Sequence, residues 1–404
     1  MSSQESYLDI LTQVIDDVVA PGAPAVDADG AFPRAQLDAL GAAGILALTV
    51  PAELGGGGAG LREAATVVRE LGSVCASTAM VVTMHYSAVA ALVAAGDKDT
   101  LVAIAAGTHL STLAFSEAGS RSHFWAPMST AVLSHDGAVV RLDAAKSWVT
   151  SAGYADSYVW SSRPLISASE GDGGGADAAG ADGDGGDAGA ADGPMTLWLV
   201  PAGAAGLSAA GAFDGLGLRG NASAPLTADG LLVPASALLG SDGGGLDLAL
   251  ASILPCFLIC SAAMSAGLIR RLATETADHL QRTRLAHLGV SLAQQAGPRA
   301  QLARLQIEAD RTWAHISEAL AAVADGRPDA TLLVLEVKAA AGEAAAEAAD
   351  LALRAGGGAA FRKESVVERL FRDSRAARVM APTTDALYDF IGRALLGQPL
   401  LGEV

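Results

Sequence analysis

The chain has 404 residues, which is long enough for about two or three domains with a large core. Its formal net charge of −18 argues against binding to nucleic acid, because phosphate groups would be repelled. Three cysteines are too few for a disulfide framework and favour a cytoplasmic location, and the first residues show no signal-peptide pattern. We expect neither a metal site nor a membrane span, and we interpret the apolar stretch from Ile253 to Met264 as a buried helix.

Hydrophobic periodicity divides the chain into three parts. Residues 1–110 carry apolar side chains at helical spacing, as at Leu8 and Leu11, and predict an N-terminal α-helical bundle. Residues 111–240 contain short runs of β type with turn signals between them, which predict a small middle β domain. Residues 241–404 return to the helical period and predict a C-terminal helical bundle. The predicted fold class is therefore α+β.

Residues 167–194 interrupt the β domain. They are almost wholly Gly, Ala, Asp and Ser, and they include seven carboxylates: Glu170, Asp172, Asp177, Asp182, Asp184, Asp187 and Asp192. Such a tract buries too little apolar surface to offset the entropy lost on ordering, so we predict a disordered insertion between two strands. Calcium binding is the alternative interpretation, but the ligand spacing of an EF-hand is absent from the tract.

The most informative stretch lies near the C-terminus. The glycines of 356–358 are followed by a mixed charged and apolar run over 361–375, a break at Pro382 and a final helical segment. This order resembles the C-terminal signature of the acyl-CoA dehydrogenase family of flavoproteins, and residues 44–57 resemble the family's N-terminal Pro-Glu-x-Gly-Gly turn. The resemblance covers nearly the whole chain outside the insertion. It implies an N-terminal helical bundle, a β-barrel-like middle domain and a C-terminal four-helix bundle.

The resemblance implies FAD as cofactor and places part of its site in the β domain. Residues 114–122 resemble the family loop Thr-Glu-Pro-Gly-Ala-Gly-Ser, although Ala118 replaces the proline. In the family, the backbone before the first hydroxyl and that hydroxyl hold the flavin ring, and the last serine reaches the pyrophosphate. The corresponding residues here are Phe115, Ser116 and Ser122. A polar surface loop is the alternative interpretation.

A second segment, residues 146–153, resembles the family strand Lys-x-Trp-Ile-Thr-Asn-Gly. There the tryptophan packs on the flavin and the threonine hydroxyl bonds the ring near N5, which implies these roles for Trp148 and Thr150. Regular alternation along a strand would put both side chains on one face. The alternative is a buried tryptophan with no cofactor beside it.

Further cofactor contacts are implied in the C-terminal part. Arg284, with Arg282 as the alternative, stands near the family arginine that reaches the FAD diphosphate of a neighbouring subunit. The remaining assignments, from the Gly-Gly turn, the position before it and the end of the signature, are Gly357, Gly358, Arg354 and Thr383. Contacts between subunits imply a homodimer or homotetramer. Residues 215–223 resemble the family's Gly-x-Arg-Gly-Ser segment near the domain junction.

The family's usual general base has no counterpart at its position. Where the signature reads Tyr-Glu-Gly-Thr, this chain reads Met380-Ala381-Pro382-Thr383. Some family members carry the glutamate on the first long C-terminal helix, where this chain has Ala249. A carboxylate near the α carbon is what ordinary α,β-desaturation needs. The catalytic residue therefore stays unknown, with His85 as a weak candidate and a core histidine as the simpler interpretation.

These observations leave three functional hypotheses. The first is an FAD-dependent oxidoreductase that acts on an acyl thioester, on CoA or a carrier protein, with non-standard proton abstraction. The second is a flavin-dependent monooxygenase of the same fold that acts on a small molecule. The third is a non-catalytic member of the family, retained as a subunit.

Overall fold

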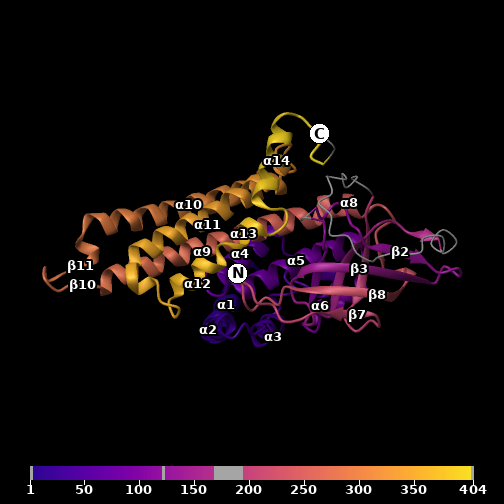
Figure 1. Ribbon diagram of the computed structural model, residues 1–404, viewed down its shortest axis with the longest axis horizontal. Coiled ribbons are helices and arrows are strands. Elements are labelled where there is room, and N and C mark those ends of the chain that lie inside the picture. Colours follow the sequence, from indigo (N-terminus) through magenta and orange to yellow (C-terminus); the bar gives the residue numbers. More distant parts are fainter. Residues whose placement is uncertain (1–2, 121–122, 168–193, 402–404) are drawn as a thin grey trace, which may run out of the picture.

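The computed structural model describes residues 3–120, 123–167 and 194–401. The molecule is elongated, with the β domain at one end and long C-terminal helices reaching the other (Figure 1). The N-terminal helices lie between them along one side. Ser122 and nearly all of the predicted insertion, residues 168–193, lie outside the described residues.

The N-terminal domain is helical, as predicted. Its helices are α1 (Ser3–Val14), α2 (Ala20–Ala28), α3 (Arg34–Ala42), α4 (Leu61–Gly72), α5 (Ala76–Ala95) and α6 (Lys98–Ala105), with short helical segments η1 (Ile15–Val19) and η2 (Ala52–Leu54). Most side chains of α5 are buried on every side, because its sequence is apolar all round. This central helix packs on α4, on strand β1 (Ser111–Ala114) and on the C-terminal helix α9 (Leu254–Arg282).

The middle domain consists of two sheets around one hydrophobic core. One sheet has the strand order β1-β4-β6-β9 and the other has the order β5-β2-β3-β8-β7. The strands are β2 (Thr130–Leu133), β3 (Val139–Val149), β4 (Ser157–Ser162), β5 (Ile166–Ser167), β6 (Thr196–Pro201), β7 (Leu207–Ala209), β8 (Ala224–Pro234) and β9 (Leu238–Leu239). Their shared core holds Trp160 and Trp198 from the first sheet and Val140 and Leu226 from the second. A short η3 (Ala235–Ala237) links the last two strands.

The C-terminal domain is built on three long helices that pack on one another. They are α9, α10 (Ala296–Ala324) and α11 (Ala330–Ala360). Shorter elements precede, connect or cover them: α8 (Gly245–Leu248), η4 (Ala249–Ile253), β10 (Arg284–Leu285), β11 (Val290–Ser291), η5 (Leu292–Gln294), α12 (Val366–Asp373), α13 (Ala376–Val379) and α14 (Thr384–Leu395). Near the end of α11 the helix is broken at Gly357, whose φ of 56° suits a residue without a Cβ.

The expectation about membrane spans needs a correction. Two helical stretches, Ala76–Ala95 and Gly245–Arg282, are long and apolar enough to cross a membrane. Within the protein, 72% and 67% of their most apolar windows are buried, which is typical of central helices in a packed core. The expectation was based on the length of unbroken apolar runs. In these two helices serine, threonine or histidine interrupts the apolar runs without adding a charge, so the runs looked too short.

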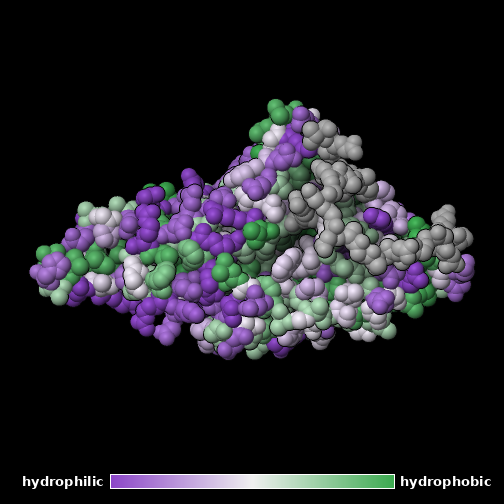
Figure 2. All heavy atoms as spheres, in the orientation of Figure 1, coloured by the Kyte–Doolittle hydropathy of each residue, from purple (hydrophilic) through white to green (hydrophobic). Residues whose placement is uncertain are grey.

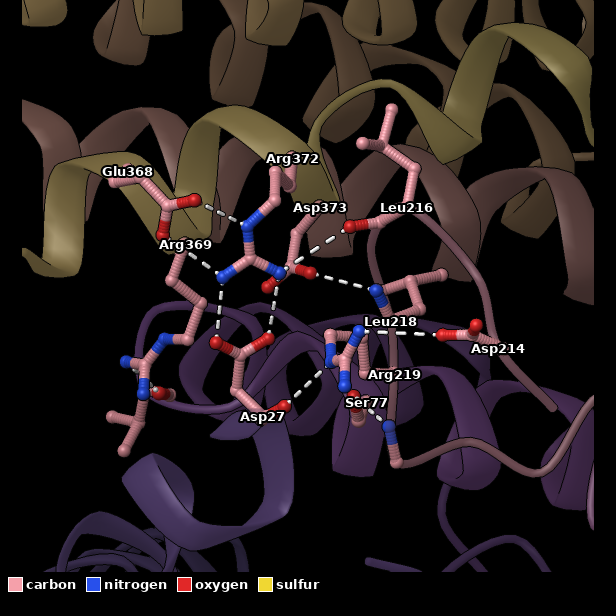
Figure 3. A network of polar contacts seen from close by, with 12 residues as sticks. Asp27, Ser77, Asp214, Leu216, Leu218, Arg219, Glu368, Arg369, Arg372 and Asp373 are labelled. Carbon is pink, nitrogen blue, oxygen red and sulfur yellow. Dashed lines mark hydrogen bonds and ion pairs between the residues drawn. The ribbon is translucent and has the colours of Figure 1, made fainter. Parts of the chain in front are cut away.

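The segment that resembles the family's Gly-x-Arg-Gly motif joins all three domains (Figure 3). Leu218 donates its backbone N–H to the buried Asp373 carboxylate at 2.7 Å, and Arg219 donates to the carbonyl of Asp27 at 2.8 Å. Arg372 closes the junction with two bonds to the Asp27 carboxylate, at 2.8 and 2.6 Å, and an ion pair with Glu368. The packing is close, since a Cβ on Gly217 would lie 2.5 Å from the carbonyl oxygen of Arg372.

Candidate functional site

A mainly apolar pocket lies where the three domains meet. It contains about 550 Å³ of space that no atom occupies, including its open mouth. Its walls come from α5, the end of β1, the bulged end of β3, the η4–α9 helix and the turn before α14. The lining residues are Met84, Leu113, Phe115, Ser116, Phe124, Ser147, Trp148, Val149, Ala249, Ile253, Leu254, Phe257, Ala381 and Pro382. Three of the predicted cofactor residues, Phe115, Ser116 and Trp148, therefore come together.

A buried ion pair holds the β-domain wall of this pocket. The Lys146 ammonium group contacts the Glu117 carboxylate, and the two side chains are 0% and 3% exposed. Lys146 also donates to the carbonyl and the hydroxyl oxygen of Ser161, at 2.7 and 2.9 Å. Glu117 accepts the backbone N–H of Ser129 at 3.0 Å and the Ser129 hydroxyl. Burial lowers the pKa of Lys146 to about 8, and the carboxylate of Glu117 opposes that shift.

This ion pair positions two serines of the pocket. Ser116 immediately precedes Glu117 and Ser147 immediately follows Lys146, and the Ser147 N–H donates to the Ser116 carbonyl at 2.9 Å. Because the paired side chains point into the β-domain core, the serines that flank them are held at the pocket edge. The two segments are thus held together although Ala118 stands where the resemblance leads us to expect a proline.

Trp148 presents an exposed indole to the pocket. Its side chain is 69% exposed, and its φ of 57° lies in a region that non-glycine residues rarely adopt. The pairing of β3 with β8 shifts register between Lys146 and Val149, so strict alternation is broken at this point. An exposed indole at the wall of an apolar pocket is a surface that a flat ring can cover, so these residues fit a bound flavin.

The same bulge overturns the expected relation between Trp148 and Thr150. Thr150 is buried, its hydroxyl lies 3.1 Å from that of Ser223, and it is not among the lining residues described for the pocket. The prediction that both side chains share one face does not hold here, because it assumed an unbroken strand. Of the two, only Trp148 lines the pocket.

Ala381 and Ala249, the two positions at which the resemblance leads us to expect a glutamate, both line this pocket. Ala381 and Ala249 come from segments more than 130 residues apart in sequence and share the pocket with Phe257 and Met84. Among the described residues that line it, none has an ionisable side chain; Ser116 and Ser147 supply the polar atoms. The pocket can therefore hold apolar groups and offer hydroxyl and backbone hydrogen bonds.

His85 does not reach the pocket, although its neighbour Met84 does. The imidazole is fully buried, Nε2 donates to the Leu46 carbonyl at 3.1 Å, and Nδ1 accepts the Ser111 N–H at 3.2 Å. Burial lowers the pKa of His85 to about 4, which keeps the ring neutral. Both nitrogens are thus occupied by backbone groups, and the weak catalytic candidate has a structural role.

A second, more polar hollow lies between the ends of α9 and α11. Arg282, His279, Gly356, Arg362 and Ser365 are among its lining residues. Arg282, not the preferred Arg284, borders it, because Arg284 begins the exposed β10 strand. Gly357, Gly358 and Arg354 lie at or beside the break in α11, but they are not among the described residues that line the hollow.

Thr383 has a local task at the start of α14. Its hydroxyl accepts the N–H of Ala386 at 3.3 Å and so caps the helix, and Thr383 is not among the described pocket-lining residues. The apolar lining residues Met84, Phe124, Ile253, Leu254 and Phe257 were not predicted. Only their positions on apolar segments signalled burial, and periodicity cannot tell a pocket wall from a core.

Comparison with known proteins agrees with this architecture. The family described as "Acyl-CoA dehydrogenase, N-terminal domain" matches residues 1–100, and "Acyl-CoA dehydrogenase, C-terminal domain" matches residues 243–396. Human mitochondrial short-chain specific acyl-CoA dehydrogenase is 28% identical over 375 residues, covering 90% of this chain and 83% of the relative.

Two solved structures share the fold over nearly the whole chain. Butyryl-CoA dehydrogenase from Megasphaera elsdenii has a TM-score of 0.85 at 20% identity and covers 98% of each chain. KijD3 in complex with FMN and a dTDP-3-amino sugar has a TM-score of 0.80 at 22% identity, covering 99% of this chain and 95% of the other. From the two family matches, which together span more than half of its length, the chain belongs to the acyl-CoA dehydrogenase family of FAD-dependent oxidoreductases.

Proposed function

We propose that this protein oxidises an acyl thioester, presented on CoA or on a carrier protein, without the customary carboxylate base. The observation that carries the proposal is the lining of the apolar pocket: Trp148 and Ser116 face the same space as Ala381 and Ala249. In this proposal Trp148 and Ser116 would contact the cofactor, and Ala381 and Ala249 would stand where the resemblance leads us to expect the proton acceptor.

Each wall of the pocket has a separate task in this proposal. Trp148, Phe115 and Ser116 would hold the flavin, which when bound supplies the electron acceptor for the oxidation. Ile253, Phe257 and Met84 would enclose the acyl chain and exclude water. Arg282 beside the second hollow would oppose the diphosphate of a neighbouring subunit's FAD, in place of Arg284.

With no ionisable group among the described lining residues, the α proton has to leave to water or to a group of the substrate itself. Substrates with an acidified α carbon therefore fit this pocket better than simple acyl chains, because a weak acceptor can remove an acidic proton. A general base typically contributes about 10²- to 10⁴-fold in rate. A simple acyl-CoA should accordingly reduce the bound flavin slowly.

The test uses the holoenzyme under nitrogen with a panel of acyl-CoA thioesters, and follows loss of the visible flavin absorption. Ala381→Glu should accelerate reduction by simple acyl-CoA by about 10²-fold or more, while the equally large but neutral Ala381→Gln should not. Equal rates in both variants, or no reduction by any thioester with either, would disprove the proposal. Protein that purifies without flavin and cannot be reconstituted would support the non-catalytic alternative.

A flavin-dependent monooxygenase is the second candidate. The lack of an ionisable side chain among the described lining residues supports it, because oxygenation does not need a carboxylate at Ala381 or Ala249. The fold is shared with KijD3, whose complex holds FMN and a nucleotide sugar. Oxygen consumption that depends on a small-molecule substrate, with no flavin reduction by thioesters under nitrogen, would favour this candidate.

A homodimer or homotetramer completes the proposal. Hydrophobic residues stand beside hydrophilic ones on the projecting end of α14 (Figure 2), and Leu395 and Leu396 at the end of this helix are 67% and 74% exposed. An exposed apolar projection of this kind is compatible with burial against another subunit. Light scattering of the holoenzyme gives the assembly size directly.

A further inference from the structure

Lys338 lies in the first third of α11, and its ammonium group lies behind one wall of the pocket. The residue is 1% exposed. Its Nζ donates to three backbone carbonyls of the segment before α14: Ala377 at 2.8 Å, Met380 at 3.0 Å and Pro382 at 2.6 Å. An ammonium group has three N–H donors, so each donor has one acceptor. One side chain thus holds the whole turn that carries Ala381.

A glycine allows this turn to come close. Gly342 lies four residues after Lys338 in α11, so both face the same side of the helix. A Cβ on Gly342 would lie 3.3 Å from the Cβ of Ala377, which is tighter than ordinary van der Waals contact. The α13 segment therefore packs closely against α11, near enough for the Lys338 ammonium group to reach the backbone carbonyls of the turn.

Among the described residues, no carboxylate forms an ion pair with Lys338. Charged side chains of the neighbouring elements pair with others: Arg378 of α13 with Glu343 of α11, and Arg393 of α14 with Asp389. Burial lowers the pKa of Lys338 to about 7. A buried ammonium without a counterion is costly, so a lysine here is not favoured by stability alone. The contribution of Lys338 is to the geometry of the turn, because its three N–H donors fix the positions of three backbone carbonyls at once.

We propose that Lys338 is a positioning residue for the pocket, which fixes the turn from Ala377 to Pro382 so that Ala381 and Pro382 form its wall. Replacement of the ammonium group leaves the three carbonyls without this donor, and the turn can then move relative to Ala249. The role concerns the same pocket as the proposed function, but it can be tested without substrate.

The experiment introduces Ala381→Cys and measures its rate of labelling by iodoacetamide in the holoenzyme. Cys75, Cys256 and Cys260 are buried and give a low background. Adding Lys338→Met should raise the labelling rate of Cys at position 381 by about 10-fold, because local opening exposes the turn. Lys338→Arg keeps the charge and the donors and should restore a rate closer to that of the parent.

A matched control separates positioning from a general loss of stability. Leu231→Ala truncates a fully buried residue of β8, far from the turn, and should change labelling less than about twofold. Equal labelling in the Lys338→Met and Leu231→Ala backgrounds, or an unchanged rate after Lys338→Met, overturns the proposal. If the methionine variant does not fold, Lys338→Gln takes its place. A labelling rate in that variant equal to the parent rate would also overturn the proposal. An enzyme that fails every thioester test but shows these rates would disprove only the proposed function.

Discussion

Replacing Lys146 by methionine should destabilise the protein through the carboxylate that remains. Methionine preserves most of the side-chain volume and removes the charge, so Glu117 is left buried without its partner. Breaking a buried ion pair from one side typically costs about 3–5 kcal/mol of unfolding free energy. Glu117 keeps donors from Met128 and Ser129, so we expect a loss near the lower end, about 3 kcal/mol.

A second substitution gives the sign test. Glu117→Gln removes the charge but keeps an oxygen that can accept the N–H groups of Met128 and Ser129. In the wild-type background it should destabilise, because the Lys146 ammonium loses its carboxylate. In the Lys146→Met background it should instead restore about 1–2 kcal/mol, because the uncompensated charge is gone.

Urea unfolding followed by tryptophan fluorescence measures these effects. Lys146 Nζ lies 5.0 Å from the ring centre of Trp160, so the signal comes from the same core. The exposed Lys98→Met is the control and should stay within about 0.5 kcal/mol of wild type. A Lys146→Met protein within about 1 kcal/mol of wild type, or further destabilisation by Glu117→Gln in that background, would refute the reasoning.

Four further predictions follow from individual contacts. Burial lowers the pKa of Lys338 to about 7 from 10.5, so the folded state releases this proton first and unfolding free energy should rise from about pH 7 to 10.5. In Lys338→Met, urea titrations should show a smaller increase in unfolding free energy above pH 7 than in the wild type. The same dependence on pH in both proteins would contradict this prediction. Burial raises the pKa of Asp373 to about 6 from 3.8, so the folded state binds this proton more tightly than the unfolded state. The free energy of unfolding of the wild type should therefore fall by up to about 3 kcal/mol as the pH rises from 4 to 6, and Asp373→Asn should not show this fall. Gly267→Ala would place a Cβ 2.2 Å from the Arg69 carbonyl oxygen and should lower the free energy of unfolding by about 1–3 kcal/mol. The control Gly392→Ala should be neutral or stabilising, because a Cβ there meets no atom within 4 Å apart from its chain neighbours and the backbone of its own helix. Arg372→Met should destabilise the domain junction by about 1–3 kcal/mol in thermal unfolding, and an unchanged melting temperature would show that Asp27 and Asp373 hold the junction without it.

Local patterns predicted the order of domains well. The all-round apolar sequence of α5, the β-type run in β3 and the apolar spacing of the long helices α9 to α11 were all visible in the sequence, because burial requires apolar residues at matching positions. The structure brings the segments around Ser116 and Lys146 together, and the hydrogen bond from the Ser147 N–H to the Ser116 carbonyl joins them. The exact role of Thr150 could not be predicted, because a bulge changes the facing of every later residue and leaves no reliable mark in the sequence.

The sequence by itself determined that residues 249 and 381, where the resemblance leads us to expect a glutamate, are alanine, since residue identity needs no coordinates. Only the tertiary structure decided that Ala249 and Ala381 line one pocket with Trp148, that His85 is turned away from it, and that Lys338 holds the turn behind it. Each of these facts depends on contacts between segments far apart in the chain. Such contacts are fixed by packing of whole domains, whose geometry no local pattern contains.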